Sequence, residues 1–232
     1  MKKRIFPSPD IYATYPYDGK VLSYYADVFP SVYIAFSPFI EPVSIPPELF
    51  QLTTYPDRMS IANNCKAVLW KDVAKRSGLP NVAAVDIALR TQIHALRPGF
   101  MNIDYANRLE RFYETDGILA PTEGEHSALL HNKVLELFQA LGHDWVWVGD
   151  DFCTERKLYW IDDLKEGIKD PISGPRHCNV FAPDKTLLWT VHWDSHFSFL
   201  CSSSETALKS ADVEEKLEGF FCDPETEVYW SL

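Results

Sequence analysis

The sequence predicts an α+β fold, in which a helical middle segment is followed by an antiparallel, hairpin-rich sheet. Apolar residues recur at helical spacing in residues 58–142, and they alternate with period two in much of residues 143–232. In addition, eleven of the sixteen prolines fall in the first 100 residues, nine of them before position 60. Residues 1–57 are therefore expected to form an irregular arm rich in proline and tyrosine. The length of 232 residues fits a single domain, residues 1–232.

The N-terminal arm contains one segment suited to a strand, Val28 to Phe36. Prolines at positions 38, 42, 46 and 47 exclude a central strand or a long helix after it. We expect the arm to pack over a body formed by the rest of the chain. The alternative is an arm that binds a peptide or a partner protein.

The helical part is expected to contain helices over residues 60–77, 82–97, 103–114 and 122–141. The first ends at Gly78, and Asn81 is a suitable N-cap for the second. Thr122 and Glu125 have the spacing of a capping box, which places the start of the fourth helix at Thr122.

The last part of the chain is expected to form strands over residues 145–148, 158–160, 177–182, 187–193, 197–201 and 227–230, with a helix over 211–220. Pro183-Asp184-Lys185-Thr186 is a hairpin signal between two of these strands. Pairing Ala182 with Leu187 across this turn places Asn179 opposite Thr190.

Composition and charge narrow the function classes. With 22 basic and 33 acidic residues the net charge is −11, which disfavours a nucleic-acid surface because phosphates are neutralised by clustered Lys and Arg. No apolar run is long enough for a membrane helix or a secretion signal, so no membrane partner is expected. The five cysteines are odd in number and widely spaced, which favours a reducing, cytoplasmic location.

A His/Asp cluster on the C-terminal hairpin is the first candidate site. A regular strand from residue 187 would place His192, Asp194 and His196 on the polar face, and the hairpin register would bring His177 opposite His192. Three imidazoles and a carboxylate form a ligand set for Zn or Fe, so a metal-dependent enzyme is one alternative. The other interpretation is an ordinary solvated sheet face, and a turn at Asp194 would scatter the set.

The segment from Asp72 to Val85 is the second candidate, because it resembles the helix-turn-helix of bacterial repressors. The charge over residues 71–97 is locally positive, which fits a DNA-binding regulator. Against it, the turn is one residue longer than in the repressors, and Asp86 would face phosphate on the reading helix. Two packed helices joined by a glycine turn are the simpler interpretation.

Paired acids offer little support for catalysis. Asp150 and Asp151 are the best catalytic candidates because they follow the strand at 145–148, where functional carboxylates are common, but neighbours in sequence do not converge on one atom. The chain contains no nucleotide-binding, nucleophile-elbow or zinc-protease motif, so it predicts no cofactor with a known fingerprint.

Residues 188–201, which read Leu-Trp-Thr-Val-His-Trp-Asp-Ser-His-Phe before Leu200 and Cys201, resemble a small family of uncharacterised bacterial proteins. That family brings no activity with it. The last third is also loosely similar to the acidic, aromatic immunity proteins that neutralise bacterial toxins. This resemblance implies a protein that binds another protein through an acidic, aromatic surface. We therefore rank protein binding first, a metal-dependent enzyme second and a DNA-binding regulator third.

Overall fold

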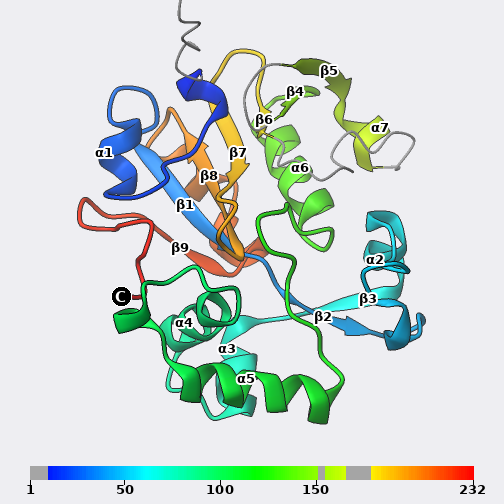
Figure 1. The fold of residues 1–232 in the computed structure, drawn as a ribbon. Coiled ribbons are helices and arrows are strands. Elements are labelled where there is room, and N and C mark those ends of the chain that lie inside the picture. The colour runs from blue at the N-terminus through cyan, green and yellow to red at the C-terminus, as the bar shows by residue number, and fades with distance from the viewer. Residues whose placement is uncertain (1–9, 151–154, 166–178) are drawn as a thin grey trace, which may run out of the picture.

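The computed structural model describes residues 10–150, 155–165 and 179–232 (Figure 1). The helices are α1 (Val21–Tyr25), α2 (Arg58–Asn64), α3 (Trp70–Ser77), α4 (Val82–Gln92), α5 (Ile103–Asp116), α6 (His131–Ala140), α7 (Ile161–Lys165), α8 (Ala207–Ser210) and α9 (Val213–Lys216), with 3-10 turns at Ile11–Ala13, Pro47–Leu49 and Pro98–Phe100. The strands are β1 (Ser31–Phe36), β2 (Phe39–Pro42), β3 (Cys65–Val68), β4 (Trp145–Gly149), β5 (Arg156–Trp160), β6 (Asn179–Phe181), β7 (Leu187–Val191), β8 (Phe197–Ser202) and β9 (Gly219–Phe221).

A seven-stranded sheet in the order β5-β4-β6-β7-β8-β1-β9 forms the centre of the described structure. Every neighbouring pair in it is antiparallel, and β2 and β3 form a second, two-stranded sheet. The predicted α+β class is confirmed, with helices in the middle of the chain and strands toward its C-terminus. The predicted hairpin register is also confirmed, since Val180 pairs with Trp189 and the Ala182 N–H donates to the Leu187 carbonyl.

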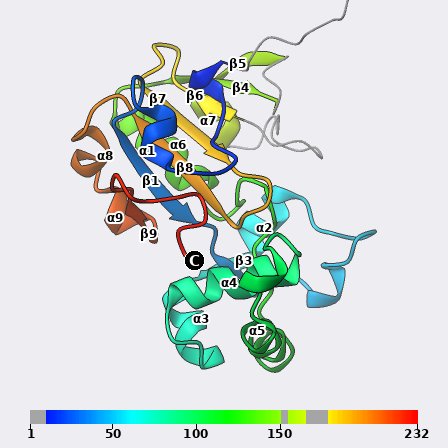
Figure 2. The same ribbon diagram turned by 60° about the vertical axis from the view of Figure 1, so that its left-hand side comes forward.

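Both faces of the sheet are covered. The face that carries Ile34 and Phe199 packs against α1, α3 and α4, and the face that carries Tyr33 and Trp189 packs against α6 to α9. Figures 1 and 2 show α3, α4 and α5 together below the sheet, apart from α6 and α7. The interpretation of the polar residues as a solvated sheet face is therefore wrong. The hydroxyl and imidazole groups on these strands are buried.

The N-terminal segment contributes to the sheet itself. β1 lies between β8 and β9, and all six of its residues are buried, so it is more than part of a covering arm. A proline-rich stretch can supply this strand because prolines flank it, at Pro30 and Pro38, and do not interrupt its ladder. Pro42 falls at the end of β2, where a missing N–H is tolerated.

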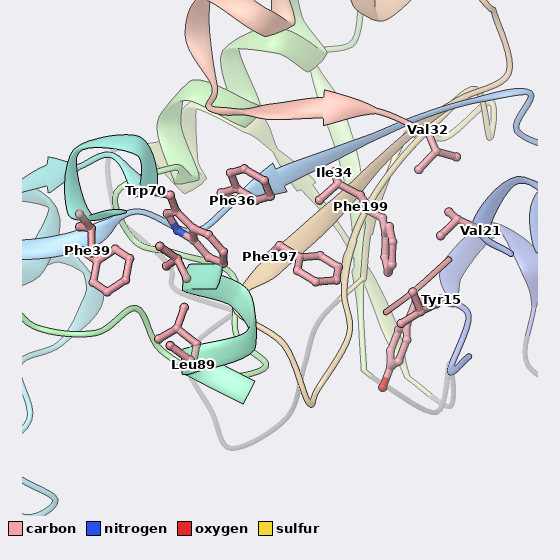
Figure 3. Close-up of a cluster of buried hydrophobic side chains, with 14 of the residues drawn as sticks. Tyr15, Val21, Val32, Ile34, Phe36, Phe39, Trp70, Leu89, Phe197 and Phe199 are labelled. Atoms are coloured by element: carbon pink, nitrogen blue, oxygen red, sulfur yellow. The ribbon is translucent and has the colours of Figure 1, made fainter. Parts of the chain in front are cut away.

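An aromatic core joins α3 to the end of β1. The Trp70 indole stacks on Phe36 at a centroid distance of 4.5 Å, and its Nε1–H donates to the Ser37 carbonyl (Figure 3). α3 has no side-chain cap of its own; instead, the Glu218 carboxylate accepts the N–H groups of Trp70 and Lys71 at 2.6 and 2.9 Å. Glu218, which is 148 positions from Trp70 in the sequence, thus supplies the N-terminal cap of α3.

Three local predictions were wrong. Residues 60–77 do not form one helix, because Cys65–Val68 pairs with β2 and separates α2 from α3. Residues 122–130 do not extend α6, because Gly124 has φ of 60° and donates to the Ser195 carbonyl, so the chain is held in turns there. Residues 211–220 form the short helix α9, turns and the start of β9, and residues 227–230 form turns with one isolated bridge, from Glu227 to Lys20, in place of the last strand.

Candidate functional site

The loop between β7 and β8, residues 192–196, holds three of the predicted metal ligands. The chain reverses in this loop, so Trp189 and Phe199 lie on opposite faces of the sheet. His192 is 2% exposed; its Nε2 lies 3.1 Å from the Tyr17 carbonyl, and its Nδ1 accepts the Asp194 N–H at 3.1 Å. This pattern requires the tautomer with the proton on Nε2. The ring also contacts Tyr15, so His192 fastens the N-terminal segment to the loop.

The other two residues of the set face different surroundings. His196 is 3% exposed, and burial together with the nearby Arg90 charge lowers its pKa to about 3. Asp194 is partly exposed, and its charge adds to burial in raising the pKa of the Glu123 carboxyl. His177 lies outside the described residues. Among the described residues, no group of three or more His, Cys, Asp or Glu side chains has the arrangement of a metal site. The four-residue set stays a prediction.

The structure places Asp150 at the end of β4, where its backbone pairs with Glu155 and its carbonyl accepts the Asn179 amide. Asp151, its proposed partner, lies outside the described residues. These backbone contacts of Asp150 are those of a strand end.

A buried ion pair on α4 links the helical layer to this loop. Asp86 and Arg90 are both 0% exposed, and Arg90 Nε donates to Asp86 Oδ2 at 2.9 Å. The other two guanidinium nitrogens of Arg90 donate to the carbonyls of Asp194 and Val228, at 3.2 and 3.1 Å. Ser231 adds a 2.6 Å bond to Asp86, while burial raises the pKa of the Asp86 carboxyl against the effect of Arg90. One pair therefore holds the β7–β8 loop and the C-terminal segment together.

The same burial removes the DNA-binding alternative. In the repressor arrangement the second helix must be exposed to enter the major groove. Here Val85, Leu89 and Arg90 of α4 are at most 1% exposed. α3 and α4 are two packed helices, joined at Gly78 with φ of 72°.

The C-terminal segment forms the wall of a groove at the protein surface. This C-terminal groove has a volume of about 460 Å³ and is lined chiefly by three aromatic and three acidic residues: Phe220, Tyr229, Trp230, Asp223, Glu225 and Glu227. None of the described residues that line it is basic. The end of the chain lies beside α4 in both views (Figures 1 and 2).

The aromatic residues of the groove pack against Arg90 and the aromatic core. The Arg90 guanidinium lies 4.7 Å from the centre of the Tyr229 ring. Trp230 stacks on Phe36 at 5.3 Å and meets Phe220 edge-on at 5.1 Å. The rings are therefore held in place by the core.

The acidic side is a turn that is pinned to the N-terminal segment. The Val21 N–H donates to the Thr226 carbonyl, and the Val228 N–H donates to the Gly19 carbonyl. The Thr226 hydroxyl bonds the Asp223 carboxylate and lowers its pKa, so this acid is ionised at neutral pH. The Lys20 ammonium lies 2.8 Å from the Glu225 carboxylate. Because this ion pair is exposed to solvent, another cation can replace Lys20 in it.

Sequence reasoning missed this groove because it assigned residues 211–220 and 227–230 to a helix and a strand. Asp223-Pro224 is a turn signal, and residues 220–230 carry acidic residues in the middle and aromatic residues at both ends. Those features indicate a polar turn with exposed acids. They do not show that the aromatic residues share a cavity, since that depends on Arg90 and Phe36, far away in the sequence.

A model of the family DUF2711, described as proteins of unknown function, matches residues 17–232. The chain belongs to this family. DUF2711 has no assigned activity, so membership confirms the expectation of an uncharacterised family and assigns no residue a role. The matched region of the DUF2711 chain includes β1, α4 and the C-terminal groove. Searches of curated proteins and of solved structures gave no significant match. No helix in the described part of the chain has the length and apolar character needed to cross a membrane.

Proposed function

We propose that this protein binds another protein, and that the C-terminal groove receives a basic segment of that partner. The observation that carries the proposal is the composition of the groove, in which three acidic residues line the same cavity as Phe220, Tyr229 and Trp230. Lys and Arg side chains suit such a site because their charged ends pair with carboxylates while their alkyl stems and guanidinium planes pack on aromatic rings.

Charge and rigidity both support this partner chemistry. The protein carries a net charge of −11, which attracts basic partners at long range and speeds their association. The groove rings are already packed against Arg90 and Phe36, so little side-chain entropy is lost on binding. The loose resemblance of the last third of the sequence to acidic immunity proteins leads to the same expectation of a protein partner. A cytoplasmic location belongs to the same proposal, and Cys65, Cys201 and Cys222 are free thiols.

A charge-matched pair of variants tests the proposal with a hexa-arginine peptide as the probe. Glu225→Gln with Glu227→Gln removes two groove charges, and Glu214→Gln with Glu215→Gln removes two exposed charges from α9, outside the groove. Both double variants have the same net charge. In fluorescence anisotropy at low salt we expect the groove variant to bind about tenfold more weakly than wild type, and the α9 variant to stay within about twofold. Equal losses in both variants would show attraction by overall charge only and would overturn the groove proposal.

A further inference from the structure

β5 ends the seven-stranded sheet, and within the described residues it pairs with β4 alone. An edge strand exposes a row of unpaired backbone groups that can template another strand. Two apolar side chains are exposed at this end of the sheet, Leu158 of β5 at 38% and Trp145 of β4 at 44%, beside the exposed cations Arg156 and Lys157.

The direction of the backbone groups follows from the β4–β5 ladder. The Ile161 N–H donates to the Asp144 carbonyl, and the Asp150 N–H donates to the Glu155 carbonyl. Bonded pairs alternate along an antiparallel ladder, so Lys157 and Tyr159 also bond to β4. The N–H groups of Arg156, Leu158 and Trp160 consequently point away from the sheet.

We infer that two copies of this chain pair through β5, antiparallel and with Leu158 opposite Leu158 of the second copy. The occupant of the edge is then the same strand, and the two sheets join into one. In this register the outward N–H and carbonyl groups of Leu158 bond those of the other Leu158. The outward N–H groups at positions 156 and 160 also fall within the ladder.

The side chains favour this register over its neighbours. Residues opposite each other in an antiparallel pair lie on the same face, so Arg156 faces Trp160 of the second copy and Lys157 faces Tyr159. Lys157 thus lies beside an aromatic ring of the second copy, as it does within its own chain, where the ammonium is 5.5 Å from the centre of the Tyr159 ring. The Arg156 guanidinium keeps its contacts within its own sheet, over Trp147 and Phe181. A slip that centred the pairing on Lys157 would place two lysines directly opposite each other, which is unfavourable.

The apolar face continues across the joint. Trp145 and Trp160 are cross-strand partners with rings 5.0 Å apart, and Leu158 pairs with Trp147 on the same face. Joining two copies in the stated register places the Trp145, Trp160 and Leu158 side chains of one copy beside those of the other. Their apolar surface is thereby removed from water. A contact of one strand on each side is small, so the dimer is expected to be reversible and dependent on concentration.

Sedimentation velocity over a range of protein concentrations tests the pairing. Leu158→Pro removes an outward N–H and the leucine side chain but no hydrogen bond to β4, and Leu158→Lys places two like charges at the twofold axis. We expect each to weaken dimerisation at least about tenfold. Leu158→Thr, which keeps the N–H and is suited to a strand, should retain the dimer.

Amide hydrogen exchange provides a second readout that does not depend on any variant. The Leu158 amide should become protected as concentration rises, while the amides of Lys157 and Tyr159 are protected throughout by β4. A wild-type chain that stays monomeric, with a Leu158 amide unprotected at every concentration, would overturn the inference. A dimer of unchanged strength in Leu158→Pro and Leu158→Lys would do the same. These outcomes are independent of peptide binding in the C-terminal groove.

Discussion

The buried Asp86–Arg90 ion pair leads to a specific prediction about the free energy of unfolding. Replacing Arg90 by Met removes the cation and leaves the Asp86 carboxylate at 0% exposure, where the Ser231 hydroxyl still donates to it. It also removes the donors to the carbonyls of Asp194 and Val228. Loss of one partner of a buried pair costs about 3–5 kcal/mol, and we expect Arg90→Met to lie in that range.

The double variant separates the ion pair from its surroundings. Asp86→Leu alone leaves Arg90 buried and uncompensated, and is expected to cost about 3–5 kcal/mol as well. With both groups replaced no charge is stranded, so the double variant should cost roughly 2–3 kcal/mol, from the unsatisfied carbonyls and imperfect packing. The two single costs should therefore exceed the double cost by at least about 3 kcal/mol.

Equilibrium urea unfolding, followed by tryptophan fluorescence, measures these free energies. Arg108→Met is the matched control, because Asp104 and Arg108 form a pair of the same i,i+4 spacing on α5 with side chains 62% and 40% exposed. Its cost should be below about 1 kcal/mol. Additive single variants, or an Arg90→Met cost as small as that of the control, would refute the role given to the buried pair.

Three further predictions concern single positions. Gly219→Ala should destabilise the fold by about 3 kcal/mol, because its Cβ would lie 1.9 Å from the Ile34 carbonyl oxygen, whereas Gly99→Ala, with open space around it, should unfold at nearly the wild-type urea concentration. His196 has a pKa of about 3 in the fold, so its contribution to stability is complete above pH 6.5 and declines as the pH falls toward 3. About 3 kcal/mol of the free energy of unfolding should be lost by pH 4.5. Urea unfolding of His196→Gln, which should show a smaller decline, checks this. Both ring nitrogens of His192 are hydrogen-bonded, so elemental analysis is expected to find no stoichiometric Zn or Fe, and a metal that is lost in His192→Ala would revive the metal-enzyme alternative.

Local turn chemistry explains the part of the fold that sequence predicted well. The β6–β7 register follows from the turn at residues 183–186, where the Asp184 carboxylate accepts the Thr186 N–H and hydroxyl. The predicted proximity of Asn179 and Thr190 follows from that register, and their side chains are hydrogen-bonded. α5 was placed well because Gly117, with φ of 65°, ends it as a C-terminal cap.

Non-local contacts explain the rest. Cys65–Val68 has apolar spacing compatible with a helix, and only its pairing with β2 makes it a strand. The His/Asp set was assigned to one regular strand, but the chain turns at residues 192–196 because Ser195 bonds the carbonyls of His192 and Phe197. The groove depends on Arg90 reaching Val228 across a sequence separation of 138, which no local pattern reveals.

The central claim is that basic segments bind in the C-terminal groove, and the seven tryptophan indoles allow a direct test by NMR. Titration with the hexa-arginine peptide should shift the indole resonance of Trp230, which lines the groove, while that of Trp193 stays in place. Trp193 is 51% exposed and lies outside the groove and outside β5, so it reports non-specific contact. A shift at Trp193 with none at Trp230 would contradict the claim.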